Sequence, residues 1–247
     1  METIEISMPG GGRAEAYLAS PAEDGEYPGV LFFMDAIGLR SQIAEMCRRI
    51  ADWGYVVLAP NVFHREGNVA DLAPRGDLTQ PGAREEFFAQ AMPRVRALTA
   101  ELAELDIPRY LAVLRELPAV DDGPVGSTGY CMGARLALRA GCLDPDVGAV
   151  GGFHGGGLVT DGEDSPHLGL PASQAEFFFG HADNDRSMPR EAVEKLGRAL
   201  EAAGLSATNV VFEGATHGYT MADTPAYDEA AAERHFVELE DLFDRAL

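Results

Sequence analysis

Hydrophobic positions along the chain follow two kinds of pattern. Short continuous apolar runs, typical of strands buried on both faces, recur at 28–35, 55–63, 124–130, 147–154, 175–180 and 208–214. Between many of these runs, apolar residues return every three or four positions, as on one face of a helix. Such helical segments are 107–117, 132–141, the stretches that end at Gly54 and Gly204, and the C-terminal tail. This alternation predicts a mostly parallel central sheet flanked by helices on both faces.

Two segments depart from the alternation. Residues 4–8 and 14–19 alternate apolar and polar positions around a Gly-rich turn, which predicts an N-terminal hairpin. Residues 64–106 are first polar and rich in Pro and Gly and then helical, with Pro93 as the expected break. We expect this segment to be a helical excursion from the sheet that covers a site. With no linker or internal repeat, residues 1–247 are expected to form a single domain.

The net charge of the chain bears on which binding partners are expected. The 40 acidic residues outnumber 19 basic ones, which gives a net charge of −21. Such a surface repels nucleic acid and anionic lipid, so neither is an expected partner. Adaptation to high salt and a GC-rich genome that favours Arg over Lys both explain this composition, and the sequence leaves the choice open.

The location and the metal content are also constrained. No apolar run is long enough to span a membrane, and the N-terminus lacks the pattern of a secretory signal, so we expect a cytoplasmic protein. Cys47, Cys131 and Cys142 show no metal-like spacing, and we expect neither a disulfide framework nor a metal site.

The strongest chemical signal is the sequence Gly-Tyr-Cys-Met-Gly at residues 129–133, between a predicted strand and a predicted helix. A turn of this form presents Cys131 at the carboxyl end of the sheet, with glycines where the backbone is crowded. The next N–H and the helix N-terminus stabilise a thiolate there. A buried, unreactive thiol is the alternative, since free Cys is among the most buried residue types.

Downstream residues favour the catalytic interpretation, because this turn precedes first an acid and then a His in chain order. Only His217 combines that order with a Gly-flanked loop after the last core strand, where an imidazole can turn toward a nucleophile. The loop after 175–180 offers two acids, Asp183 and Asp185, and spacing alone does not decide between them. Other loop Asp residues commonly form turns.

Oxyanion donors and pocket residues follow from the same topology. The N–H groups of Ala36 and Met132 are the expected oxyanion pair. Asp35 lies at the mouth of the site, with helix capping as its alternative role. Tyr130, Phe153 and His154 are expected to line the substrate pocket. His154 begins the run HGGG, which in lipases precedes the nucleophile but here follows it, so it is not a triad member.

These residues together resemble the dienelactone hydrolase family, within the α/β-hydrolase fold. The resemblance rests on GYCMG around Cys131, GATHGY around His217, GYVVLAPNVFHR at 54–65 and MDAIGL at 34–39. It spans the chain from about residue 28 to the end and implies a single-domain α/β-hydrolase.

The resemblance also implies roles. It implies a Cys-His-Asp triad that attacks a lactone or ester carbonyl, and the spacing Asp185-Arg-Ser-Met-Pro matches the family's acid. It implies that Asp35, a Glu in the family archetype, tunes Cys131. Arg65 matches an arginine that holds the substrate carboxylate, whereas Met221 replaces a second substrate arginine.

The sequence therefore predicts a hydrolase that acts on small esters or lactones, with anionic ones among the candidate substrates. We expect it to be a monomer or a small homo-oligomer. No cofactor is expected for this chemistry. A non-catalytic binding protein and a thiol-based redox or sensor protein are the alternatives. Cys142, about three helical turns from Cys131, is too far along the helix for a disulfide.

Overall fold

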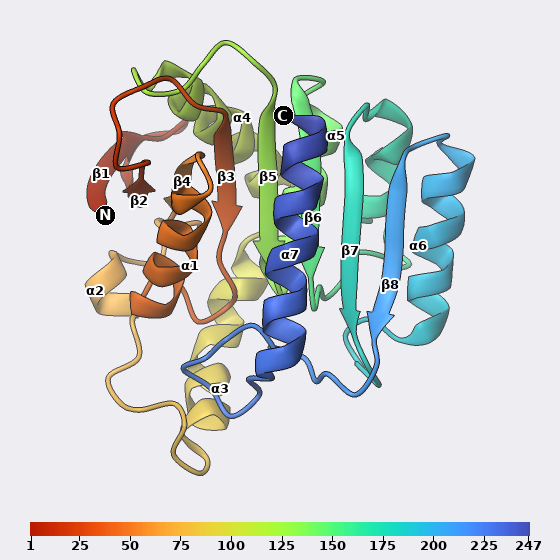
Figure 1. Cartoon of the computed structure of the whole chain (residues 1–247). Helices are drawn as coiled ribbons and strands as arrows, with labels where there is room; N and C mark the ends of the chain where they lie inside the picture. The colour runs from red at the N-terminus through yellow and green to blue at the C-terminus, as the bar shows by residue number, and fades with distance from the viewer.

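The computed structural model describes residues 1–247, and one sheet of eight strands runs through it (Figure 1). The strand order is β1-β2-β4-β3-β5-β6-β7-β8. The strands are β1 (Glu2–Ser7), β2 (Arg13–Ala19), β3 (Gly29–Phe33), β4 (Val56–Pro60), β5 (Val125–Tyr130), β6 (Val147–Phe153), β7 (Glu176–Ala182) and β8 (Ala207–Phe212). Only β1 and β2 run antiparallel to their neighbours. The predicted hairpin and the mostly parallel sheet are therefore confirmed.

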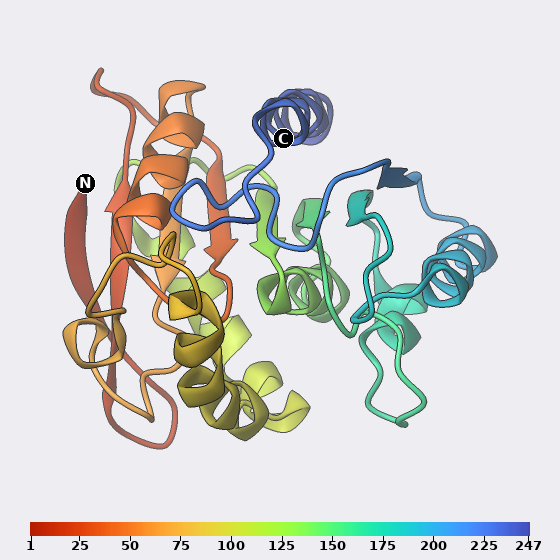
Figure 2. The same cartoon turned by 90° about the horizontal axis from the view of Figure 1, so that it is seen from below.

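Helices cover both faces of the sheet, as the sequence predicts (Figures 1 and 2). One face carries α1 (Ser41–Asp52) and α7 (Glu229–Ala246); the other carries α4 (Ala100–Glu116), α5 (Met132–Leu143) and α6 (Arg190–Ala202). The central strands β3, β4 and β5 are buried along their whole length, and this explains their continuous apolar sequences.

Local sequence sets the ends of the helices. Gly54 follows α1 with a φ of 104° and donates its N–H to the carbonyl of Ala51, which ends the helix there. Gly204 follows α6 with a φ of 70° in the same way. Both positions favour glycine because an L side chain rarely adopts a positive φ.

The excursion at 64–106 differs from the prediction in where it breaks. It contains α2 (Val69–Leu72) and α3 (Ala83–Ala97), and α3 continues through Pro93. The break falls at Leu98, where Thr99 caps α4 by accepting a hydrogen bond from the N–H of Leu102 at 3.3 Å. Burial of the turn after Pro93 compensates for the missing proline N–H.

The carboxyl ends of the parallel strands meet at one edge of the sheet, below which α3 and the loop between β8 and α7 lie in Figure 1. A short 3₁₀ helix, η1 (Pro166–Ala172), precedes β7 and was not predicted. None of the helices combines the length and the apolar composition that a membrane crossing requires.

Candidate functional site

The turn between β5 and α5 carries Cys131 in a strained backbone conformation. Its φ is 55° and its ψ is −119°, outside the regions that L residues favour. A Cβ on Gly129 would lie 2.1 Å from the carbonyl oxygen of Gly133, and a Cβ on Gly133 would lie 2.3 Å from that of Phe33. Glycine is therefore the residue that lets the helix start this close to the sheet.

His217 connects the cysteine to an acid. Its Nε2 lies 3.0 Å from the Cys131 sulfur, and its Nδ1 lies 2.6 Å from Oδ2 of Asp185. The other oxygen of Asp185 accepts hydrogen bonds from the N–H and the hydroxyl of Ser187, at 2.8 and 2.7 Å. Both oxygens of the Asp185 carboxylate thus accept hydrogen bonds, and the carboxylate fixes the orientation of the His217 ring.

The structure separates the two candidate acids. Oδ2 of Asp183 accepts the N–H of Gly214 at 3.1 Å, so this residue closes a loop beside β8. Asp185 alone of the pair contacts His217. Asn184 between them has a φ of 52°, and this left-handed residue turns the chain between the two carboxylates.

Electrostatics favour a charged imidazole. Burial alone would lower the pKa of His217, but the charge of the Cys131 sulfur and the hydrogen bond to Asp185 raise it to about 10. Burial would likewise raise the pKa of Asp185, but its hydrogen bonds with His217 and Ser187 lower it. The imidazole of His217 and the carboxylate of Asp185 therefore form an ion pair at neutral pH.

A tight turn at 35–38 follows the carboxyl end of β3. Gly38 donates its N–H to the carbonyl of Asp35 at 3.2 Å. The N–H of Ala36 has no hydrogen-bond partner in the protein. Met132 occupies the first position of α5, where a helical N–H has no acceptor within the helix. These two N–H groups are the ones that the sequence predicts to act as oxyanion donors.

One known protein family matches almost the whole length of the chain. The model of the dienelactone hydrolase family matches residues 14–247. The chain belongs to the dienelactone hydrolase family. Its place there confirms the expected fold class and makes it a member of a hydrolase family.

Two curated relatives and a solved structure illustrate the family. A Methylorubrum extorquens protein with the provisional name carboxymethylenebutenolidase is 27% identical over 242 residues, covering 92% of this chain and 75% of that protein. A carboxymethylenebutenolidase of a Pseudomonas species is 26% identical and covers 93% of this chain and 89% of its own. A dienelactone hydrolase-like promiscuous phosphotriesterase from metagenomic libraries has a TM-score of 0.74 at 20% identity and covers 99% of this chain and 98% of its own. At that identity the structural likeness shows the fold alone.

Asp35 lies beside the site, but its carboxylate is held by an arginine. Arg40 donates hydrogen bonds to its two oxygens at 2.7 and 3.1 Å, and the N–H of Ile37 adds a third at 3.0 Å. The structure contains no hydrogen bond between Asp35 and Cys131, which is the contact that the tuning role requires. Arg40 also pairs with Asp223, so all its donors are used within the protein.

Met221, at the position of the family's second substrate arginine, touches the same guanidinium. Arg40 Nη2 lies 3.3 Å from its sulfur. An arginine head is therefore present near this position, although it comes from another part of the chain. Because Arg40 is saturated and only 7% exposed, it is not available to a substrate.

Two of the three expected pocket residues belong to the core. Tyr130 and Phe153 are fully buried and stack on each other, and the hydroxyl of Tyr130 contacts His235. Because neither side chain is exposed, neither lines an open pocket. His154 is different: its ring packs edge-on against His217 at 5.3 Å between centroids, and burial lowers its pKa well below the usual range.

Arg65 is occupied elsewhere. Both of its terminal nitrogens bond the buried carboxylate of Asp106, at 2.5 and 2.8 Å, in a bidentate ion pair. That pair connects the chain after β4 to α4 and engages both terminal nitrogens of Arg65 within the protein.

Arg84 on α3 is the arginine that sequence reasoning missed. A Cβ on Gly218, the neighbour of His217, would lie 3.6 Å from its Nη2. Its Nε is buried without a partner, and no carboxylate pairs with it. The signal in the sequence is its place in the excursion expected to cover a site.

The remaining thiols differ from Cys131. All three cysteines are free, and burial raises the pKa of both Cys47 and Cys142. Neither is therefore a reactive partner for a redox cycle. The structure gathers no group of three or more His, Cys, Asp or Glu side chains suited to hold a metal ion.

Proposed function

We propose that the chain hydrolyses small carboxylic esters or lactones through Cys131, His217 and Asp185. The observation that carries the proposal is that one imidazole bonds the sulfur on one side and the carboxylate on the other, at 3.0 and 2.6 Å. Nucleophile, base and orienting acid in this arrangement are what acyl transfer requires.

In the first half of the reaction, Nε2 of His217 holds the proton that the sulfur of Cys131 gives up, and the sulfur bonds to the carbonyl carbon. The π electrons of the carbonyl move to its oxygen, which accepts hydrogen bonds from the N–H groups of Ala36 and Met132. When the carbonyl re-forms, the C–O bond of the ester breaks and His217 gives its proton to the departing alkoxide. The acyl group is now a thioester on Cys131.

Water completes the cycle. His217 takes a proton from water, the resulting hydroxide bonds to the thioester carbon, and the C–S bond breaks to regenerate the thiolate beside a protonated imidazole. Asp185 accepts the Nδ1 hydrogen bond throughout, which keeps Nε2 directed at the sulfur and stabilises the imidazolium charge.

Arg84 gives the proposal a substrate preference. Its guanidinium lies beside the loop of His217 and has no carboxylate partner in the protein, which supports binding of an anionic group on the substrate. A carboxylate separated from the scissile carbonyl by a short spacer would reach both Arg84 and Cys131. The substrate class that the site fits best is thus an ester or lactone with a free carboxylate.

A pair of para-nitrophenyl esters tests this function, one with a neutral acyl chain and one with a carboxylate at the end of the same chain. Cys131→Ala should abolish turnover of both. Arg84→Gln should raise KM for the anionic ester about tenfold to a hundredfold, the worth of one charged hydrogen bond, and leave the neutral ester unchanged. Arg96→Gln, at an exposed position of the same helix, is the matched control. Unchanged turnover in Cys131→Ala would refute the proposed function.

A further inference from the structure

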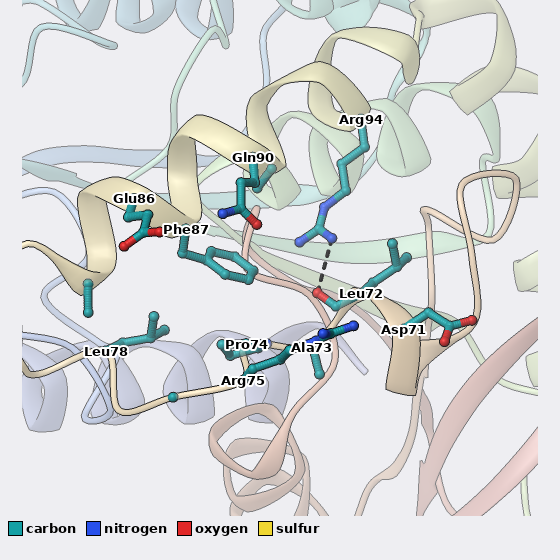
Figure 3. Close-up of a pocket in the computed structure, with 13 residues that line it drawn as sticks. Asp71, Leu72, Ala73, Pro74, Arg75, Leu78, Glu86, Phe87, Gln90 and Arg94 are labelled. Carbon is teal, nitrogen blue, oxygen red and sulfur yellow. Dashed lines mark hydrogen bonds between the residues drawn. The ribbon is translucent and has the colours of Figure 1, made fainter.

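A cavity of about 780 Å³ lies between α3 and the segment 71–78, which contains the end of α2 and the loop after it (Figure 3). Phe87 and Leu72 provide apolar wall, and the polar side chains of Arg75, Gln90 and Arg94 also face it. None of the residues of the thiol site lines it. The volume is that of a small-molecule site rather than of a packing defect.

Arg94, which lines this cavity, is a buried cation that makes no salt bridge. It is 8% exposed, and its terminal nitrogens bond three backbone carbonyls, those of Leu72, Ala36 and Ile37, at 3.0 to 3.1 Å. Its Nε is buried with no partner. Arg40, the other equally buried arginine, is paired with two carboxylates.

The lack of a direct ion pair has an energetic consequence. Burial lowers the pKa of Arg94, while the charges of Asp35 and Glu66, which do not contact it, raise the pKa. Asp71 and Glu86 line the cavity, but neither pairs with Arg94, and in Figure 3 the carboxylate of Asp71 points away from it. An anion that entered the cavity would supply the direct ion pair that the protein itself does not.

We propose that this cavity is a second binding site, which takes a small organic carboxylate with an apolar body. The carboxylate pairs with Arg94 and Arg75 and accepts a hydrogen bond from the Gln90 amide, while the apolar body lies against Phe87 and Leu72. A compact inorganic anion would leave most of the cavity and its apolar wall unfilled.

Arg94 connects this cavity to the 35–38 turn by hydrogen bonds. The guanidinium that would bind the ligand also holds the carbonyls of Ala36 and Ile37, at 3.1 and 3.0 Å. A ligand carboxylate competes with these carbonyls for the same N–H groups, so occupancy must change the surroundings of the turn. If the proposed hydrolase function holds, acids of the product class would act on the oxyanion donors from outside the catalytic site.

The test measures binding and not turnover, so its result does not depend on the proposed function. Benzoate is titrated into Arg84→Gln protein, which lacks the anion position beside His217, while backbone amide shifts are recorded by NMR. We expect saturable shifts at Leu72, Ala36 and Ile37, and none with the neutral analogue benzamide.

Two single substitutions on α3 complete the design. Gln90→Glu places a carboxylate one helical turn from Arg94 and should weaken benzoate binding tenfold or more. Ala89→Glu adds the same charge at the exposed neighbouring position, outside the cavity, and should not weaken binding beyond twofold or so. Equal affinity of the two variants, shifts confined to the loop around Gly218, or equal response to benzamide would overturn the proposal.

Discussion

Replacement of Arg40 by Met tests the energetic role of the buried ion pair beside the site. In the folded protein the side chains of Arg40 and Asp35 are 6% and 4% exposed, and two hydrogen bonds join them. Although burial alone would lower the pKa of Arg40, its two carboxylate partners raise it. Methionine preserves much of the volume and removes only the charge and the donors.

The expected cost is large because Asp35 would keep a single donor, the N–H of Ile37, while its side chain is only 4% exposed. Removal of one partner from a buried pair costs about 3–5 kcal/mol. In a chain of this length each kcal/mol lowers Tm by roughly 2–4 °C, so the expected fall is about 6–20 °C. The double variant Asp35→Asn/Arg40→Met should be more stable than Arg40→Met alone, because position 35 then has no buried carboxylate without its cation.

Thermal unfolding followed by far-UV circular dichroism measures this effect. Arg198→Met is the matched control, since Arg198 and its partner Glu194 are 64% and 61% exposed and their pair contributes at most about 0.5 kcal/mol. If Arg40→Met and Arg198→Met unfold at the same temperature, the buried pair does not stabilise the fold and the reasoning is wrong.

Two further predictions concern catalysis. Asp185→Asn should lower kcat/KM for an aryl ester by about 10²–10⁴, because the imidazole loses its orienting carboxylate. Asp183→Asn affects only a contact with Gly214 and should stay within about tenfold of wild type. A larger loss in Asp183→Asn than in Asp185→Asn would exclude Asp185 as the acid. The kcat/KM profile should fall as pH rises through about 10, where His217 loses the proton that it gives to the leaving group. Because the folded pKa of His217 is raised, the stability linked to this proton is complete below about 6.5, the ordinary histidine pKa, and is lost as pH rises toward 10. A flat profile through that range would contradict the charged imidazole.

The features that the sequence predicts well are local ones. The strand–Gly–x–Cys–x–Gly–helix order around Cys131 is contained in a dozen residues, and its geometry follows from sterics of the turn. Buried strands and helical periodicity reflect solvent contact residue by residue, so the sequence predicts the sheet and the helix ends at Gly54 and Gly204, whereas α4 begins at Ala100, before the expected 107–117. Pro93 misled because the buried turn after it outweighs the lost hydrogen bond.

The features that the sequence does not predict depend on contacts between distant segments. Arg40 meets Asp223, 183 positions away, and this contact decides where the carboxylate of Asp35 points. Arg84 reaches the loop of His217 from an excursion whose sequence has no strong periodicity. Tyr130 flanks the nucleophile in sequence, yet strand alternation turns its ring into the core.

The most direct test of the central claim is to trap the acyl group during turnover. An activated aryl ester is mixed with the protein, the reaction is quenched in acid, and the peptide that contains Cys131 is examined by mass spectrometry. We predict that the Cys131 peptide gains the mass of one acyl group and that hydroxylamine removes this group. Hydrolysis by wild-type protein and by Cys131→Ala at equal rates, with no adduct on the Cys131 peptide, would contradict the claim that this cysteine is the nucleophile.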